Sequence, residues 1–193
     1  MATPRTYHHG DLRRAVLSAA IEVIRSDGVA AISLRDLARR AEVSHAAPAH
    51  HFKDKAGLLT AIATEGFDLL AAAVTTVPAG DAHRLREMGA RYVEFALGHP
   101  AHFEVMFQPG LLHRDDPELA AAKERASRAL HSGVDGLPAA RRGPDAPRTA
   151  LAAWSLAHGF ATLQLSGSLP PLEADPVDTF RALVDDHTGA GGP

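Results

Sequence analysis

The stretch ISLRDLARRAEVSHAAPAHHFKDKAGLL, residues 32–59, sets the architecture of the N-terminal part of this chain. Ser33 and Asp36 match a capping box, in which the hydroxyl of the first residue accepts a hydrogen bond from the backbone three residues on. Leu37 and Ala41 then recur at helical spacing. A short helix is therefore predicted from residue 34 to about residue 41.

The second half of the stretch predicts a turn and two further helices. After the turn at Glu42, Ser44 is expected to cap a helix from His45 to about His51. Asp54 is expected to cap a longer helix over residues 55–76. Two short helices on either side of a tight turn are typical of a helix-turn-helix, a DNA-binding motif.

Upstream of the stretch, one more helix completes a tri-helical head. Leu12, Val16 and Val23 fall on one face of a helix predicted over residues 11–27, and Gly28 suits its C-terminal end. The head is therefore expected to span residues 1–54, with an N-terminal arm at residues 1–10.

Downstream, the chain reads as helices only. A break at residues 78–80 follows the 55–76 helix, which is expected to connect the head to a body spanning residues 77–188. No strand pattern appears, so the predicted fold class is all-α, and residues 189–193 are expected to form a disordered tail. The body helices are predicted near residues 82–98, 100–107, 117–132, 145–167 and 175–187.

Composition and charge narrow the class of protein. The absence of cysteine among the 193 residues excludes disulfides, thiolate metal sites and cysteine nucleophiles. The net charge is −3, but residues 1–60 carry nine cations and six anions, so a basic head joins an acidic body. The N-terminus lacks the apolar segment of a secretory signal, and the uncharged stretch 149–172 is interrupted by polar and turn residues. A cytoplasmic protein without a membrane span is expected.

Three stretches together resemble the tetracycline-repressor (TetR) family of regulators. Residues 32–59 are similar to the DNA-binding signature of that family. The upstream YHHGDLR at residues 7–13 and the later WSLAHGF at residues 154–160 resemble a subgroup whose C-terminal domain is named for a Trp-His-Gly motif. The resemblance implies a homodimeric repressor that binds a palindromic operator and is released by a small apolar or amphipathic effector. No cofactor, metal or enzymatic activity is expected.

Two residues depart from the family pattern within the head. Ala49 stands where the family usually has Tyr, so a phosphate-contacting hydroxyl is missing. Glu42 stands where many members have Gly, and a left-handed conformation there would cost about 1 kcal/mol. Pro48, at the fourth position after the expected cap, cannot donate a backbone hydrogen bond and predicts a bent or tight start to the third helix. The departures at Ala49 and Glu42 are expected to affect DNA affinity rather than the fold, and Pro48 is expected to be tolerated, because the subgroup has the same SHAAP sequence.

The third helix is expected to enter the major groove with its N-terminal residues Ser44, His45, Ala46 and Ala47. His45 can contact a base or only a phosphate, and alanine methyl groups suit contact with thymine. The remaining candidates contact the phosphate backbone. They are Arg35, His50, His51, Lys53 and Lys55, the last of which matches the phosphate-binding Lys of the family.

Several of these assignments keep an alternative. His50 and His51 either face phosphate or pack beneath Phe52. Arg5, His8 and His9 either reach the DNA from the N-terminal arm or belong to a disordered extension.

Aromatic residues gather in the body and mark either a core or a ligand pocket, because both are lined mainly by apolar side chains. His158 either bonds a ligand or satisfies a backbone carbonyl. The candidate ligand-binding residues are Met88, Tyr92, Phe95, Phe103, Phe107, Trp154 and His158.

The 145–167 helix is apolar on two sides and is therefore expected to be buried on both. Leu151, Trp154, His158, Ala161 and Leu165 share one face, and Leu156, Phe160, Leu163 and Gly167 lie nearly opposite. One face is expected to pack inward. The other, with the 175–187 helix and its Val177, Phe180, Leu183 and Val184, is expected to meet a second copy of the chain.

Two other classes of protein compete with this interpretation. His99 and His102 have a metal-compatible spacing among twelve histidines, which suggests a metal sensor or a metal-dependent all-α enzyme. No hydrolase, nucleotide-binding or zinc-protease motif accompanies them. The other alternative is an architectural DNA-binding protein that senses no ligand, which would lack a cavity and bind with little specificity.

Overall fold

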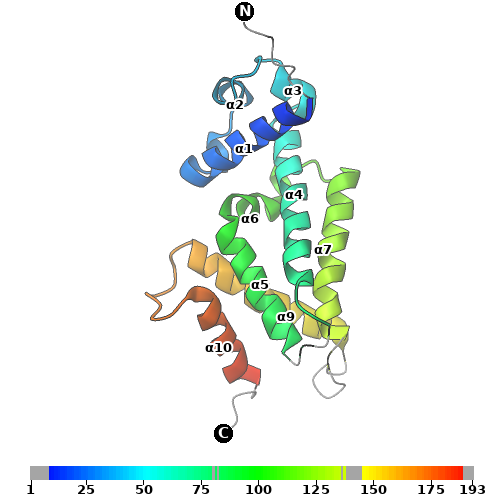
Figure 1. The fold of residues 1–193 in the computed structure, drawn as a ribbon, viewed down its shortest axis with the longest axis vertical. Coiled ribbons are helices and arrows are strands. Elements are labelled where there is room, and N and C mark those ends of the chain that lie inside the picture. The colour runs from blue at the N-terminus through cyan, green and yellow to red at the C-terminus, as the bar shows by residue number, and fades with distance from the viewer. Residues whose placement is uncertain (1–8, 80, 82, 136, 138–144, 189–193) are drawn as a thin grey trace, which may run out of the picture. The chain divides into compact units, whose positions relative to one another are not determined.

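The structure is a computed structural model that describes residues 9–79, 81, 83–135, 137 and 145–188 (Figure 1). These residues form helices joined by turns, with no strand among them, as the sequence predicts. The chain divides into two compact units, residues 1–66 with 101–120 and residues 67–100 with 121–193. The first unit thus contains a segment, residues 101–120, that the sequence assigns to the body. The predicted tail at residues 189–193 and most of the arm lie outside the described residues.

The first unit begins with the predicted helices α1 (His9–Asp27) and α2 (Leu34–Arg40). α1 ends at Gly28, whose φ of 79° favours glycine. A short 3-10 turn, Val29–Ala31, leads to α2, and the backbone N–H of Asp36 donates to Ser33 Oγ at 3.5 Å. The predicted cap of the second helix is therefore confirmed. The head core includes Val16, Ala20, Ile24, Leu37 and Phe52.

Helix α3 (Ala47–Phe52) begins two residues later than predicted. Ser44 does not cap it with its side chain, and Ser44 and His45 lie in the preceding turn. The shift places Pro48 in the first turn of the helix, where the N–H that proline lacks would have no helical partner. Pro48 therefore sets the start of α3. Because its missing N–H breaks no hydrogen bond of the helix there, Pro48 gives no reason for the predicted bend.

Helix α4 (Lys55–Thr75) starts where the sequence predicts and runs from the first unit into the second. The N–H of Gly57 donates to the Asp54 carboxylate at 2.7 Å. A Cβ on Gly57 would lie 1.9 Å from the Phe52 carbonyl oxygen, so this tight turn requires glycine. By length and composition α4 could cross a membrane, but half of its apolar window is buried within the structure, as in the core helix of a folded domain.

The remaining helices of the first unit come from the segment at residues 101–120. They are most of α6 (Pro100–Met106), a 3-10 turn at Pro109–Leu111 and the start of α7 (Pro117–Asp135).

The second unit is built from α5 (Arg84–Gly98), most of α7, α9 (Ala146–Leu165) and α10 (Pro176–Thr188). All of these helices were predicted within about three residues. Helices α9 and α10 both pack on α5. Phe180 of α10 is buried between Phe160, at a ring distance of 5.5 Å, and Gly89, where a Cβ would lie 2.8 Å from the Phe180 ring.

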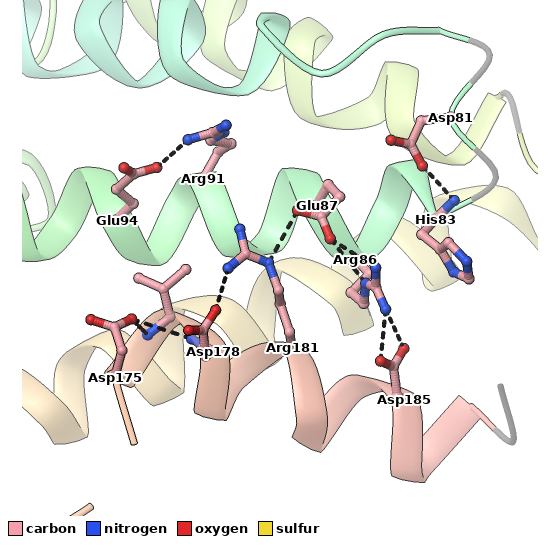
Figure 2. Close-up of polar contacts among 11 residues, drawn as sticks. Asp81, His83, Arg86, Glu87, Arg91, Glu94, Asp175, Asp178, Arg181 and Asp185 are labelled. Atoms are coloured by element: carbon pink, nitrogen blue, oxygen red, sulfur yellow. Dashed lines mark hydrogen bonds and ion pairs between the residues drawn. The ribbon is translucent and has the colours of Figure 1, made fainter. Parts of the chain in front are cut away.

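Charged side chains also hold α10 on α5, as Figure 2 shows. Arg86 donates to both carboxylate oxygens of Asp185, at 3.0 and 2.7 Å, and pairs with Glu87 at 3.0 Å. Arg181 pairs with Glu87 at 3.1 Å and with Asp178 at 2.7 Å. The charges therefore alternate in sign along the series from Asp185 to Asp178. The three side chains in the middle of this series, Arg86, Glu87 and Arg181, are only 21–29% exposed. We call these five residues the α5–α10 charge network.

The predicted division of α9 into two faces is wrong. Phe160 and Ala161 were assigned to opposite faces, yet both are buried with Ala157. A helix that is apolar on two sides does not reveal its inward direction by periodicity alone. Phe180, expected at an interface between copies, is buried within its own unit, because Gly89 leaves room for the ring.

Candidate functional site

The head exposes most of the residues predicted to contact DNA. Arg35 lies on α2, Lys55 is the first residue of α4, and the others occupy α3 and the turns that flank it. The exposed members are Arg35, Ser44, His45, Ala46, His50 and Lys53, and we call these six the head surface. His51 and Lys55 are half-buried. Ala47 is only 9% exposed, so its methyl group packs inside the head and the prediction that it contacts a base is not supported.

The two histidines of α3 differ in their surroundings. His51 lies beside Phe52, with a ring distance of 6.3 Å, and meets His50 edge-on at 5.4 Å. His50 is exposed, as is Ala49 beside it. The structure therefore favours the packing alternative for His51 and leaves the exposed His50 as a candidate for contact with phosphate.

Two cations, Arg13 of the head and Lys55 of α4, make contacts within the first unit. Lys55 Nζ donates to the carbonyl of Ala30 at 3.2 Å, which ties the start of α4 to the connection before α2. An ammonium group has three donors, so this bond is compatible with a phosphate contact. The guanidinium of Arg13 lies 5.5 Å from the centroid of the Phe52 ring, a cation–π arrangement that the sequence did not predict.

Two non-glycine residues of the head have a positive φ. Glu42, in the turn before α3, has φ 54°, and a positive φ at a non-glycine residue costs about 1 kcal/mol. Lys53, at the end of α3, has φ 65°. Both residues flank the recognition region, so backbone strain is concentrated beside the surface that would read DNA.

The segment at residues 104–113 is bonded at three points, two in the head and one on α4. The Glu104 carboxylate accepts from the N–H of Val29 at 3.3 Å, and Thr60 Oγ1 accepts from the N–H of His113 at 2.9 Å. The His113 ring contacts Asp54 Oδ1 at 2.9 Å, and this hydrogen bond is the main cause that lowers the pKa of Asp54. We call these contacts the clasp. Nothing in the sequence around His113 predicts it.

Beside the clasp lies an open groove of about 760 Å³. Small residues of α4, including Gly57, Ala61 and Thr64, form part of its lining. Its charged lining residues are Arg13, Lys53, Arg114, Asp115, Asp116 and Glu118. The three cations and three carboxylates cancel, so the groove does not select a ligand by net charge.

The structure separates the predicted ligand-binding residues. Met88, Tyr92 and Trp154 line a cavity of about 30 Å³ in the second unit. Phe95 is buried and stacks near His99 at 5.3 Å. Phe103 and Phe107 belong to the first unit and contact each other at 5.2 Å, so nearness in sequence did not predict a shared site.

A polar cluster lies at this cavity. Trp154 Nε1 donates to the Tyr92 hydroxyl at 3.3 Å, and that hydroxyl lies 2.9 Å from His158 Nδ1. Burial raises the pKa of Tyr92 far above its usual value and lowers the pKa of His158. The tyrosine is therefore protonated and the imidazole neutral at pH 7, so the Tyr92 cluster of these three residues carries no charge. The Tyr92 hydroxyl is a partner of His158 that the sequence did not predict.

The cavity is small for an effector. A buried water needs about 10–15 Å³ of such space, whereas sites for drug-sized ligands enclose about 300–1,000 Å³. Its other lining residues are Leu85, Gly89, Leu130, Ala150, Ala153 and Ala157. The spacing of the three alanines along α9 is a signal that sequence reasoning could have used.

An apolar outer face lies on α9 and α10. Among the residues that the structure describes, every large hydrophobic side chain that is exposed belongs to these two helices. They are Leu151, Trp154, Leu156, Leu163 and Leu165 of α9 and Leu183 of α10, each 37–56% exposed. We call these six residues the outer face.

A metal site is not apparent in the described part of the chain, which holds no group of three His, Asp or Glu side chains placed to bind an ion. His102 is buried, and its Nε2 lies 3.9 Å from the Glu65 carboxylate.

Comparisons with known proteins agree with this architecture. Residues 16–62 match the model of the bacterial regulatory proteins of the tetR family, and residues 85–187 match that of the tetracyclin repressor-like C-terminal domain. A Rhodococcus sp. RHA1 protein of unknown function is 37% identical, with a TM-score of 0.79, over 97% of this chain and 98% of that one.

More distant relatives have regulatory names. An uncharacterized HTH-type transcriptional regulator of Mycobacterium tuberculosis is 25% identical over 89% of this chain and 78% of its own length. The regulator LfrR of Mycobacterium smegmatis, solved with proflavine, has a TM-score of 0.62 at 22% identity and shares the fold over 89% of this chain and 93% of its own.

Proposed function

Because the chain belongs to the TetR family of bacterial regulatory proteins, we propose that it is a ligand-responsive repressor that binds a palindromic operator as a dimer. The exposed head surface carries this proposal. His45 and Ala46 are exposed just before α3, where side chains of a helix-turn-helix reach base edges. Arg35, His50 and Lys53 supply phosphate contacts from both sides. Such a protein acts in the cytoplasm.

Selection of bound DNA from a random pool tests the DNA proposal. A palindromic motif is expected, with half-sites about 34–36 Å apart or a multiple of that distance. His45→Ala is expected to relax the preference at one base position in each half-site. Lys53→Ala is expected to weaken binding to all sequences and to reduce its salt dependence. A pool that yields no palindrome would contradict the proposal.

The outer face supports a dimer formed through α9 and α10. Leucines flank a central row of small residues on α9, namely Ala152, Ser155, Gly159 and Thr162. Small residues let two helices approach closely, and the flanking leucines would bury apolar surface against a second copy. The family consists of regulators that act as dimers, which makes a second copy the expected occupant.

Gly159 offers a sharp test of the dimer, because nothing lies within 4 Å of the position of an added Cβ. Gly159→Leu is expected to leave the protomer folded and to prevent dimerisation in sedimentation equilibrium. Gly98→Leu is the matched control, because Gly98 is exposed with the same open space around it. A dimer that survives Gly159→Leu would show that another surface is used.

The effector is proposed to bind in the second unit near the Tyr92 cluster and to shift the equilibrium between two spacings of the DNA heads. Helix α4 is continuous from one unit to the other and can act as a strut. A coupling of about 1–3 kcal/mol would suffice for switching. Trp154, His158 and Gly159 also support the subgroup named for Trp-His-Gly. A compound screen for release of the selected DNA tests this step.

A further inference from the structure

The lining of the 30 Å³ cavity indicates which ligands it can accept. Apart from the Tyr92 hydroxyl and the Trp154 N–H, the side chains that line it are apolar. No Asp, Glu, Lys or Arg is among the described residues that line it. An ion placed there would lose its hydration without gaining a partner of opposite charge, whereas an uncharged apolar molecule would not.

A ligand larger than a water molecule must move one of the walls. Met88, Tyr92 and Ala157 are at most 2% exposed and are confined by the core. Leu85, Gly89, Leu130, Ala150 and Ala153 are half-buried. Trp154 is the one exposed residue among those described that line the cavity, at 39%. The indole is therefore the wall that can move at the lowest cost.

The same indole belongs to two surfaces. Its N–H is directed to Tyr92 at the cavity, and its ring forms part of the outer face with Leu151 and Leu165. Displacement of the ring away from the cavity would break the 3.3 Å bond to Tyr92 and push apolar bulk outward.

We propose that the cavity takes an uncharged apolar ligand and that Trp154 transmits its binding to the contact between two copies of the chain. The proposal rests on the proposed dimer through α9 and α10. Ligand binding moves the indole outward and weakens the dimer. By linkage, the monomer then binds the ligand more tightly than the dimer, by the same factor.

Trp154 is the only tryptophan in the chain, so its emission reports on this residue alone. The intact protein is titrated with toluene, with benzoate and with benzylammonium, which share a ring and differ in charge. Toluene is expected to give a saturable change in emission, and the two ions are not. Toluene is also expected to raise the dimer dissociation constant about fivefold or more in sedimentation equilibrium.

Two variants locate the site. Ala153→Leu fills the cavity from α9 and is expected to abolish the emission change, whereas Ala121→Leu, exposed on α7, preserves it. Leu130→Ala enlarges the cavity and is expected to lower the toluene concentration needed for half the effect. An emission change that persists in Ala153→Leu, or an equal response to the ions, overturns the cavity assignment.

The outcomes also separate this inference from the proposed function. A dimer that binds toluene with no change in its dissociation constant overturns the coupling through Trp154 and leaves the proposed dimer intact. A chain that is monomeric without toluene at all concentrations overturns the proposed dimer, and the coupling with it.

Discussion

The two compact units differ in the contacts that hold each of them together internally. In both units, side chains bond backbone N–H groups at helix starts and turns, as Ser33 and Asp54 do in the first and Asp145 and Asp175 do in the second. In the second unit, α10 is fixed by the α5–α10 charge network and by the Phe180 ring. The first unit leaves no large hydrophobic side chain exposed among its described residues, whereas the second leaves six. The first unit is therefore complete within one chain, and the second has a surface suited to another.

If the first unit depends on tight local geometry, its largest weakness is Gly57. Gly57→Ala is expected to destabilise the protein by more than about 3 kcal/mol, because the added Cβ would overlap the Phe52 carbonyl oxygen at 1.9 Å and the turn must open. Urea unfolding measures the loss. Gly98→Ala, with open space around it, is expected to be neutral or to add up to about 1 kcal/mol. Equal effects of the two substitutions would show that this turn is not tight.

If the second unit is completed by another copy, a charge on its outer face should separate the copies. Leu163→Asp is expected to weaken the dimer by about 3 kcal/mol, because each copy loses a buried leucine. Sedimentation equilibrium measures the dissociation constant, and circular dichroism should show unchanged helix content. Glu94→Asp, at an exposed position of α5, is the control with the same final side chain. If the Leu163→Asp chain unfolds, Leu163 instead stabilises the fold of the single protomer.

The charge network predicts a smaller effect within the protomer. Arg86→Met is expected to cost about 1–2 kcal/mol, because Asp185 and Glu87, which are 32% and 21% exposed, lose a shared partner. Arg91→Met removes an exposed pair with Glu94 and is expected to cost less than about 0.5 kcal/mol. Thermal unfolding at low and high salt distinguishes the two. If both variants lose a similar amount of unfolding free energy, partial burial does not strengthen the ion pairs of Arg86.

The clasp predicts the smallest effect, and a pH dependence. The pKa of Asp54 is lowered in the folded protein, chiefly by the hydrogen bond with His113. The carboxylate therefore stabilises the fold above its unfolded pKa of 3.8, and this contribution is lost as the pH falls through the lower folded value. Asp54→Asn should be slightly less stable than the parent chain at pH 6, and the difference should shrink below pH 4. Denaturant unfolding from pH 3 to 6 checks this, and a difference independent of pH would contradict it.

Local signals explain why the helices were predictable. The side chains of Ser33 and Asp54 cap helix starts, and Gly28, which has no side chain, adopts the positive φ that ends α1. The structure confirms each of these three predictions. The start of α3 was misplaced because two local rules compete there. Ser44 would be a good cap, but proline is tolerated best in the first turn of a helix. The helix therefore starts at Ala47, so that Pro48 falls in its first turn.

The site in the second unit was less predictable because it depends on packing. Phe103 and Phe107 lie close in sequence to Tyr92, but the chain from residue 101 to residue 120 belongs to the first unit. The inward direction of α9 is set by Ala157, Phe160 and Ala161, which pattern alone could not select from an apolar helix. The clasp depends on His113 meeting Asp54 across 59 positions of sequence, for which a single sequence holds no signal.

The position of α10 at the end of the chain has a consequence for synthesis. Ribosomes add about 5–20 residues each second, so the first unit can close once residue 120 has emerged. Phe180 comes much later, and until then the hollow at Gly89 and the ring of Phe160 have no cover. The nascent chain therefore exposes apolar surface for several seconds, while its DNA-binding part is already folded. A messenger RNA truncated before codon 180 would yield a polypeptide with a folded head and exposed apolar surface in its body. Such a polypeptide would be a substrate for chaperones and proteases.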